Sequence, residues 1–388
     1  MSQNIRYLQR FFLVTFLILL LALIYWQVIR APDLLARDEN PRPIVAEQRI
    51  QRGAILTLAS VSLAHTSFGP DGLAQRHYPY PAAAPVVGYY SLRYGLSGLE
   101  AAYDGRLRGQ TQPAWLADLL HLPQVGESIT VTLHLPAQMA ANAALIEAGA
   151  TGAVVVLAAQ TGEILVMASQ PTFDPNRLEA DWQALVNNPD APLLNRATQG
   201  LFPLGELARP LGLIGLFEAK AAVPADPLSA SLPELLAPLN NSSLVSTANQ
   251  LRFGQELSFT LPTAASPLPK DLPVKAEELS TTPLHLALVG AALAQDGLAP
   301  DPTLVYDPST LPTYTRLMSP ETAGRVRALS PKFSALVSPE VTGNEPLSWY
   351  LEVVAGEQPL VVVVGVTRPE ADRPLAQAIA EAVLEAIR

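Results

Sequence analysis

The sequence predicts an α+β protein with one N-terminal membrane-spanning helix, and three observations lead to this prediction. A charge-free apolar segment covers residues 11–29. Pairs of apolar segments enclose short turns, as in Gly152–Ala158 and Glu163–Ala168, which is typical of antiparallel hairpins. Other segments carry apolar residues three and four apart, or a proline near the start and a glycine past the end, which is typical of helices.

The composition limits the size and the class of the protein. A chain of 388 residues is long enough for one membrane segment and about two domains. Its residues are 49% hydrophobic and 15% charged, which favours a folded body over disorder, and its net charge of −10 argues against nucleic acid as a partner. The chain has no cysteine, and its five histidines show no metal-ligand spacing, so we expect no disulfide, no metal and no cofactor.

The apolar segment Phe11–Ile29 has nineteen residues, close to the length of a transmembrane helix. Tyr25 and Trp26 fall where aromatic side chains meet the membrane interface. A cleaved signal peptide is the alternative, but the segment is long for one and no small-residue cleavage site follows it. We therefore expect an uncleaved single-pass anchor in the plasma membrane.

The charges beside this anchor predict its orientation. Arg6 and Arg10 precede it, which favours a cytoplasmic tail of residues 1–10 and an extracytoplasmic body. Arg30 and Arg37 lie on the far side and reduce the asymmetry.

Residues 30–127 predict a β-rich first region. Arg52–Thr57 and Val61–Thr66 indicate two short strands around a turn. A strand is expected at Val86–Tyr89, followed by a glycine-punctuated corner and a helix near Glu100. Taken alone, this corner places Glu100 in an ordinary ion pair.

Residues 128–388 predict a larger second region of strands and helices. Its expected strands are Ile129–Leu133, Gly152–Ala158, Glu163–Ala168, Ser348–Val354 and Leu360–Val366. Its expected helices are Ala137–Ala148, Glu206–Ala222, Leu228–Pro238, Leu244–Leu251, Leu279–Gly297 and Pro369–Arg388.

The helix expected from Glu206 stands at the centre of the functional argument. Phe202–Gly205 is a turn signal, and Glu206 in the first helical turn favours the helix dipole. Because residues three apart share a helix face, Glu206 and Arg209 should form an ion pair. If exposed, such a pair contributes only a few tenths of a kcal/mol.

Several segments, taken in chain order, resemble the class B penicillin-binding proteins, the PbpA/FtsI-like family of peptidoglycan D,D-transpeptidases. They are Arg52-Gly-Ala-Ile55, Val86-Val-Gly-Tyr89, Gly95-Leu-Ser-Gly-Leu-Glu100, Thr161-Gly-Glu-Ile-Leu-Val-Met167, Pro171-Thr-Phe-Asp-Pro-Asn176, Asn195-Arg-Ala197 and Thr282-Pro-Leu284. The resemblance covers roughly residues 5–388. It implies a tail (1–10), an anchor (11–29), a pedestal domain (30–127) and a transpeptidase-type domain (128–388). In that last domain helices would cover both faces of a mainly antiparallel sheet.

The resemblance also implies an active site, and its motifs are degenerate here. Family members carry a serine nucleophile and a lysine at the positions that match Glu206 and Arg209. An arginine stays protonated and cannot act as a base, and a carboxylate is a poor acyl-transfer nucleophile. In the region of the family's Ser-x-Asn motif, Ser229 and Ser231 are the candidates, without the asparagine. The Lys-Thr-Gly motif matches Val341, Thr342 and Gly343, with its lysine replaced.

A search of the whole chain supports the loss of these motifs. None of the four lysines follows a serine by three positions, and none precedes Thr-Gly or Ser-Gly. The Gly-x-Ser-x-Gly pattern of other hydrolases is absent as well. A Ser-His-Asp site assembled from distant residues stays open at this point.

Three functional hypotheses follow. The first is a non-catalytic, membrane-anchored scaffold or binding protein that engages cell-wall synthesis or division machinery, such as a membrane glycan polymerase, or peptidoglycan peptides. The second is an active D,D-transpeptidase or acyl transferase that uses a non-standard serine, Ser229 or Ser231. The third is a soluble binding module released by signal cleavage.

Overall fold

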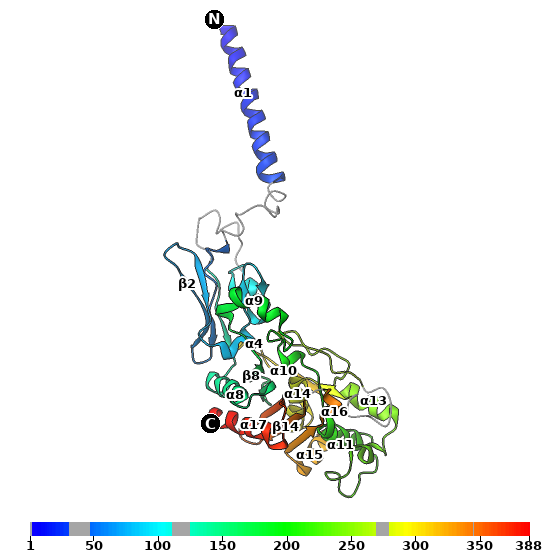
Figure 1. Ribbon diagram of the computed structural model, residues 1–388. Helices are drawn as coiled ribbons and strands as arrows, with labels where there is room; N and C mark the ends of the chain where they lie inside the picture. The colour runs from blue at the N-terminus through cyan, green and yellow to red at the C-terminus, as the bar shows by residue number, and fades with distance from the viewer. Residues whose placement is uncertain (1, 31–46, 111–124, 269–278, 344) are drawn as a thin grey trace.

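The computed structural model describes residues 2–30, 47–110, 125–268, 279–343 and 345–388. Arg37, Lys270 and Lys275 therefore lie outside the described residues. Figure 1 shows an N-terminal helix, a small β-rich domain and a larger α/β domain. The helix α1 (Ser2–Ile24) continues into a π-helical turn, η1 (Tyr25–Ile29). The stretch Ile5–Ile29 is long and apolar enough to cross a membrane, and the body of the protein buries none of it.

The pedestal is built on a four-stranded sheet in the order β3-β2-β1-β6. Its strands are β1 (Ile55–Thr57), β2 (Ser62–Phe68), β3 (Ala74–His77) and β6 (Ile129–Val131). The predicted strands around a turn at 52–66 are thus confirmed as β1 and β2. Strand β6, which we expected in the second region, pairs in parallel with β1, with Ile55 opposite Ile129. Gly53 permits this approach, because a Cβ there would lie 2.1 Å from the carbonyl oxygen of Glu127.

One predicted strand of the pedestal is wrong. Val86 and Val87 lie in a helical turn, α4 (Ala84–Val87), because Pro85 favours a helix start and Gly88, at φ +75°, ends the turn. Short elements follow it: β4 (Tyr90–Ser91), β5 (Gly95–Leu96), α5 (Gly98–Ala102) and α6 (Asp104–Leu107). A Cβ on Gly88 would lie 2.1 Å from the Ser97 carbonyl oxygen, so α4 and the start of α5 touch backbone to backbone.

A buried ionic network holds the pedestal together. Glu100 has no exposed surface and accepts hydrogen bonds from Arg52 Nη2 (2.9 Å), Arg76 Nε (2.7 Å) and the Tyr78 hydroxyl (3.3 Å). Arg52 also pairs with Asp104 at 2.7 Å. Burial alone would lower the pKa of the Arg52 guanidinium, but the Glu100 and Asp104 carboxylates outweigh it and raise that pKa. The ion pair expected for Glu100 is confirmed, with two arginines instead of one.

The larger domain is centred on a five-stranded antiparallel sheet in the order β13-β14-β15-β7-β8. Its strands are β7 (Thr151–Ala158), β8 (Ile164–Gln170), β13 (Lys332–Val337), β14 (Leu347–Val354) and β15 (Leu360–Thr367). The predicted hairpin at 152–168 and the predicted strands at 348–366 are confirmed. The edge strand β13 was not expected from the sequence.

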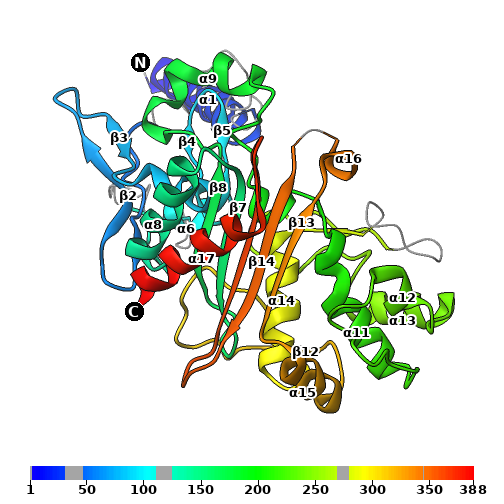
Figure 2. The ribbon, with the colours of Figure 1, turned by 60° about the horizontal axis from the view of Figure 1, so that its bottom comes forward.

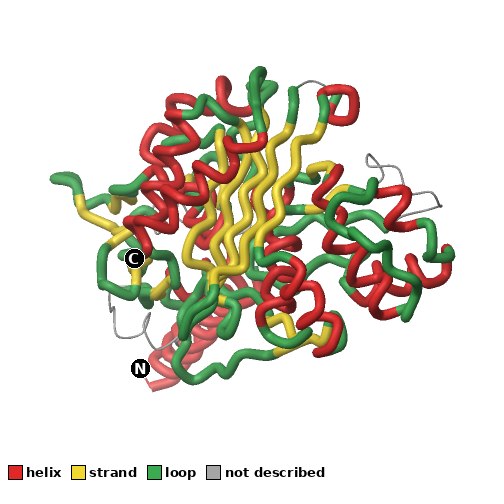
Figure 3. The backbone as a smooth tube through the Cα atoms, turned by 90° about the horizontal axis from the view of Figure 1, so that it is seen from below, coloured by secondary structure: helices red, strands yellow, loops and turns green. Residues whose placement is uncertain are grey.

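Helices cover both faces of this sheet, as expected (Figures 2 and 3). On one face lie α8 (Leu135–Glu147) and α17 (Arg373–Ile387), and on the other lies α14 (Pro283–Ala294). The side chains of the central strands alternate accordingly. Val154, Val156, Val362 and Val364 pack with α8 and α17, whereas Val155 and Val363 belong to the core around α14. Burying each such valine contributes about 1.5–3 kcal/mol.

The helix expected at Glu206–Ala222 is shorter and starts differently. It begins as a 3₁₀ turn, η4 (Gly205–Ala208), and becomes α-helical in α11 (Arg209–Glu218). Pro210 has no N–H to bond the Glu206 carbonyl, so a regular α-turn cannot form there. Further helices complete this side of the domain: α12 (Leu232–Leu236), α13 (Asn241–Gln250) and α15 (Pro320–Leu329).

Three amide side chains join the two domains. Asn195 Nδ2 donates to the Pro85 carbonyl at 2.9 Å, and Gln138 Nε2 donates to the Ala82 carbonyl at 2.9 Å. Asn176 accepts from the backbone N–H of Tyr78 and donates to its carbonyl. Asn195 also caps α10 (Arg196–Gln199), so one residue sets a helix start and a domain contact together.

Candidate functional site

A solvent-open cleft of about 560 Å³ brings four of the predicted site residues together. Glu206, Arg209, Ser229 and Ser231 all line it. The start of α11 and the segment before α12 form one side, and the edge strand β13 with the first residue of α17 forms the other. Segments far apart in the sequence thus converge where the resemblance places an active site.

The packing of η4 against β13 positions the cleft residues. Gly205 has φ +51°, and a Cβ there would lie 2.8 Å from Val337 Cγ2. Leu207 and Ala208 are buried in the core that also holds Phe333 and Val337. Glu206, between the two contacts, is directed to the solvent side.

Arg209 forms the predicted ion pair with Glu206 and is held at two further points. Its Nη2 donates to Glu206 Oε2, and its Nη1 donates to the carbonyls of Pro227 (3.1 Å) and Ala230. The Arg209 side chain is 12% exposed and that of Glu206 is 42% exposed. The guanidinium therefore ties the start of α11 to the segment before α12, and it cannot accept a proton from a nucleophile.

The two candidate serines lie at a helix start and in a turn. Ser231 is the N-cap of α12: its Oγ accepts from the Glu234 N–H, and Glu234 Oε2 accepts from the Ser231 N–H at 3.0 Å. The backbone N–H of Ser229 donates to Asp226 Oδ1 at 3.3 Å. The carboxylate beside Ser231 is that of Glu234, and the backbone and side-chain hydrogen bonds from Ser231 lower the pKa of this carboxylate, which makes it a weaker base.

Val341, Thr342 and Gly343 do not line this cleft, contrary to our expectation. Val341 and Thr342 lie in the single helical turn α16 (Pro339–Thr342), beyond the end of β13. Gly343 follows as its C-cap at φ +84°, a conformation that favours glycine. Thr342 and Gly343, which suggested the Lys-Thr-Gly motif, thus belong to the turn between β13 and β14.

The cleft contains residues that the sequence argument missed, because strand β13 was not identified. Burial alternates along β13: Phe333, Ala335 and Val337 are buried, whereas Lys332 and Ser334 are exposed. This period of two was the available signal. Arg373, the first residue of α17, also lines the cleft.

Lys332 brings a cation to the cleft without the family's Lys-Thr-Gly sequence. Its Nζ lies 2.9 Å from Glu352 Oε1 on the neighbouring strand. Glu352 Oε2 in turn accepts from the Tyr350 hydroxyl at 2.8 Å, so the ammonium group belongs to a network on the α17 face of the sheet.

A serine–histidine pair exists, but it is sealed in the core. Ser266 Oγ lies 2.6 Å from His285 Nδ1, and His285 Nε2 lies 2.7 Å from the Leu251 carbonyl oxygen. Since a carbonyl only accepts, Nε2 carries the proton and Nδ1 accepts from Ser266. Burial lowers the pKa of His285 to about 4. Ser266 is 0% exposed, so no substrate reaches its hydroxyl and the pair is structural.

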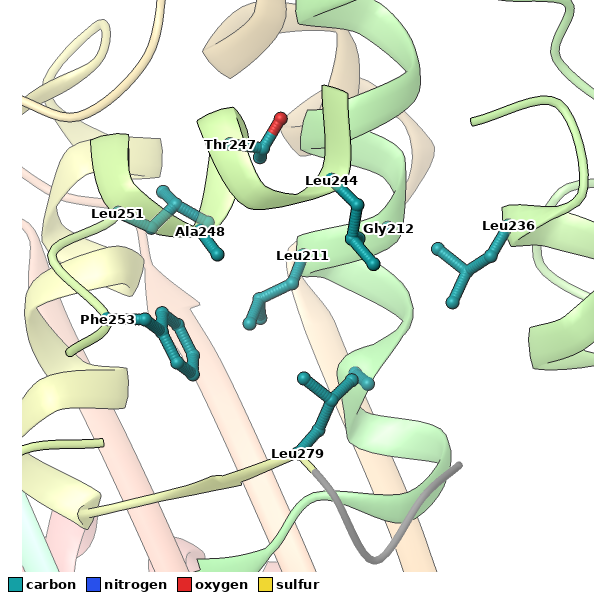
Figure 4. A pocket seen from close by; sticks show the side chains of 10 residues that line it. Leu211, Gly212, Leu236, Leu244, Thr247, Ala248, Leu251, Phe253 and Leu279 are labelled. Carbon is teal, nitrogen blue, oxygen red and sulfur yellow. The ribbon is translucent and has the colours of Figure 1, made fainter. Parts of the chain in front are cut away.

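A second, apolar pocket lies behind the cleft, between α11, α12 and α13 (Figure 4). Leu211, Leu244, Leu251 and Phe253 line it together with other apolar side chains, and Thr247 supplies a hydroxyl. Its volume of about 30 Å³ is roughly that of one water molecule. Apart from the Thr247 hydroxyl its lining is apolar, so the pocket holds no titratable group that could activate a nucleophile.

Comparison with protein families gives two matches. Residues 52–127 match the penicillin binding protein A dimerisation domain. Residues 152–205 match the penicillin binding protein transpeptidase domain, and this match ends one residue before Glu206.

Curated relatives extend the similarity to most of the chain. The chain is 29% identical to peptidoglycan D,D-transpeptidase PbpA of Mycolicibacterium smegmatis, over 86% of this chain and 80% of that protein. It is 27% identical to PbpA of Mycobacterium tuberculosis, over 92% of this chain and 86% of that protein. A shorter match, 32% identical over 38% of this chain and 29% of the relative, is to peptidoglycan D,D-transpeptidase MrdA of Escherichia coli.

Solved structures agree with these relatives. The imipenem acyl-enzyme complex of penicillin-binding protein A from M. tuberculosis superposes with a TM-score of 0.78 at 25% identity, covering 88% of this chain and 99% of that one. The D,D-transpeptidase domain of a peptidoglycan glycosyltransferase from Eggerthella lenta gives a TM-score of 0.72 at 26% identity, covering 87% and 98%. In its pedestal and its central sheet, the chain is therefore similar to the class B penicillin-binding proteins over most of its length.

Proposed function

We propose that this protein is a membrane-anchored, non-catalytic member of its family, which acts as a scaffold or binding protein in peptidoglycan synthesis or cell division. One observation carries the proposal: Arg209, which the resemblance aligns with the family's basic lysine, is bound to Glu206 and to two backbone carbonyls. An acyl transfer at this place needs a hydroxyl nucleophile and a group that takes its proton. Glu206 supplies no hydroxyl, and Arg209 accepts no proton.

The comparisons support a contrast with active relatives. The relatives carry the name peptidoglycan D,D-transpeptidase, and the M. tuberculosis protein has been seen as an acyl-enzyme with imipenem. In this chain the match to the transpeptidase family model stops at Gly205, directly before Glu206, which the resemblance aligns with the nucleophile. Both family models match segments that precede Glu206, and the PbpA relatives extend the similarity to 86% and 92% of the chain.

The proposal includes the location of the protein in the membrane and its orientation. The apolar helix α1 anchors it in the plasma membrane, and Arg6 and Arg10 favour a cytoplasmic tail of residues 1–10. Residues 30–127 and 128–388 then stand outside the cytoplasm as pedestal and transpeptidase-like domain. There the partners are cell-wall synthesis or division proteins, including a membrane glycan polymerase, and peptidoglycan peptides.

The catalytic half of the proposal is tested by turnover of a peptidoglycan stem peptide. The purified full-length chain should release no product, and the double variant Glu206→Ser with Arg209→Lys shows whether these two positions alone limit activity. Turnover by the unchanged protein would overturn the proposal. It would favour the alternative, an active enzyme with a non-standard serine, which Ser229→Ala and Ser231→Ala would locate.

The binding half is tested by capturing the full-length chain from membranes of its native host after crosslinking. We expect cell-wall synthesis or division proteins to be enriched over a capture with an unrelated single-pass membrane protein. No enrichment of any such protein would contradict a scaffold role.

A further inference from the structure

Exposed apolar side chains gather at the place where the chain leaves the pedestal for its anchor. They are Phe68, Leu92 and Val186, which are 48%, 46% and 53% exposed, together with the partly exposed rings of Tyr94 and Trp182. We call this set the anchor-side patch. It comes from three separate segments: the β2–β3 hairpin, the β4–β5 hairpin and α9 (Leu178–Asn187).

The contacts of Glu47 and Gln48 place the two hairpins beside the chain's entry into the pedestal. The Tyr90 hydroxyl donates to Glu47 Oε1 at 3.1 Å, and the Ala74 N–H donates to the Gln48 carbonyl at 2.8 Å. Ala74 is paired with Phe68 at the tip of the β2–β3 hairpin. Leu92 lines the same small pocket as Glu47 and Gln48.

Helix α9 is fastened to the β4–β5 hairpin and so belongs to the same end of the body. Tyr94 stacks on Trp182 with ring centroids 4.2 Å apart, and Ser91 Oγ donates to Glu179. Figure 2 shows α9 beside β4 and β5, and Figure 1 shows α9 at the end of the body that faces α1.

The tether keeps this end within reach of the bilayer. Sixteen residues, 31–46, separate Arg30 from Glu47, so the two lie at most about 60 Å apart even when the chain is fully extended. A single-pass anchor followed by so short a connection holds the pedestal near the membrane surface, with Glu47 leading.

We propose that the anchor-side patch inserts into the lipid interface and fixes the tilt of the extracytoplasmic body on the membrane. Tyr and Trp favour this zone because their rings are apolar and their N–H or O–H groups are polar. Arg93, whose guanidinium lies 5.1 Å from the Tyr94 ring centroid, supplies a cation for lipid phosphate groups, whereas the nearby Arg177 is paired with Asp181.

The shape of the patch favours lipid over a protein partner. Its apolar groups sit on separate hairpins and a helix, and the pocket beside Leu92 and Glu47 measures about 20 Å³, too small for a side chain. A fluid interface adapts to such isolated protrusions, whereas a protein partner needs a complementary surface with buried anchors.

Because the chain has no cysteine, one introduced cysteine is labelled at a single, known position. The full-length variant Gln183→Cys, on the exposed side of α9, is labelled with the fluorophore NBD and reconstituted into phosphatidylcholine nanodiscs. Leu329→Cys serves as the control, since it is an exposed apolar position on α15, at the opposite end of the body (Figure 1).

We expect doxyl-labelled phosphatidylcholine to abolish most of the fluorescence at position 183 and to leave that at position 329 unchanged. Adding Leu92→Glu and Val186→Glu should restore the fluorescence at 183, with circular dichroism showing an unchanged fold. Equal quenching at both positions, no quenching at 183, or quenching that the two glutamates do not reduce would each overturn the proposal. A patch reserved for a protein partner gives no quenching in these protein-free bilayers.

Discussion

The pedestal and the cleft each hold an arginine–carboxylate contact, and the two differ in burial. In the pedestal, Glu100 lies between Arg52 and Arg76 with no exposed surface. In the cleft, Glu206 meets Arg209 with 42% of its side chain exposed. The first contact belongs to a segment that matches the dimerisation-domain model, and the second begins one residue beyond the end of the transpeptidase match.

Burial makes the two contacts unequal in their expected contribution to stability. Removing one member of a buried charge network leaves the others desolvated and unpaired, which costs about 3–5 kcal/mol. An exposed pair costs less than about 1 kcal/mol to lose, so substitution there barely affects the fold. Substitutions of Glu206 should therefore affect the stability of the fold less than substitutions of Glu100.

The largest effect should come from Glu100→Gln. This change keeps the size of the side chain but removes the charge between Arg52 and Arg76, so the free energy of unfolding should fall by about 3–5 kcal/mol. Urea unfolding of the detergent-solubilised full chain, followed by circular dichroism, measures it. The control is Glu321→Gln, whose side chain is 82% exposed and should change stability by less than about 0.5 kcal/mol. Equal stability of the two variants would refute the role of burial.

Acid should destabilise the protein through His285, which is buried but uncharged. Its pKa is lowered to about 4 from an ordinary 6.5, so between these values the unfolded chain binds more protons than the folded one. The contribution of His285 to stability is full above pH 6.5 and falls by about 3 kcal/mol as the pH drops to 4. Urea midpoints at several pH values test this expectation. His285→Gln should flatten the slope in this window, and an unchanged slope would assign the acid sensitivity to other groups.

A smaller loss is expected from Asn195→Ala, which tests a neutral contact between the two domains. The variant loses the cap of α10 and the hydrogen bond to the Pro85 carbonyl, together worth about 1–2 kcal/mol. Asn187→Ala, at an exposed position of α9, is the matched control and should be nearly neutral. Should the two variants unfold at the same urea concentration, Asn195 would not be a structural link.

The smallest effect should be that of Glu206→Gln, the counterpart of Glu100→Gln. Because Glu206 is partly exposed and Arg209 keeps its two carbonyl partners, stability should fall by less than about 1 kcal/mol. The same urea titration applies. A loss as large as that of Glu100→Gln would show that the cleft pair is a structural element and would remove the contrast between the two regions.

Much of the fold could be predicted because its signals are local. The hairpin β7–β8 carries turn residues between β-branched segments, and β14 and β15 are mostly apolar, with Ser348, Glu352 and Thr367 as their polar residues. Val86 and Val87 misled because a β-branched pair is typical of a strand, whereas the neighbouring Pro85 and Gly88 set the backbone. In that segment the conformations of proline and glycine determined the backbone, and the strand propensity of the two valines did not.

The cleft was only half predictable. Glu206 and Arg209 could be paired from helix geometry, because both lie on one element. Val341–Gly343 could not be placed correctly, since their position depends on where β13 ends and α16 turns. Lys332 and Arg373 join the cleft through sheet and helix packing between distant segments, which no local pattern encodes.

Intact-mass spectrometry of the full-length protein after incubation with benzylpenicillin tests the central claim most directly. A nucleophile that survives in the cleft would be acylated and would retain the drug covalently. The account predicts the mass of the unmodified chain under conditions that fully acylate an active relative. A mass increase of one penicilloyl group, mapped to any serine of the cleft, would contradict it.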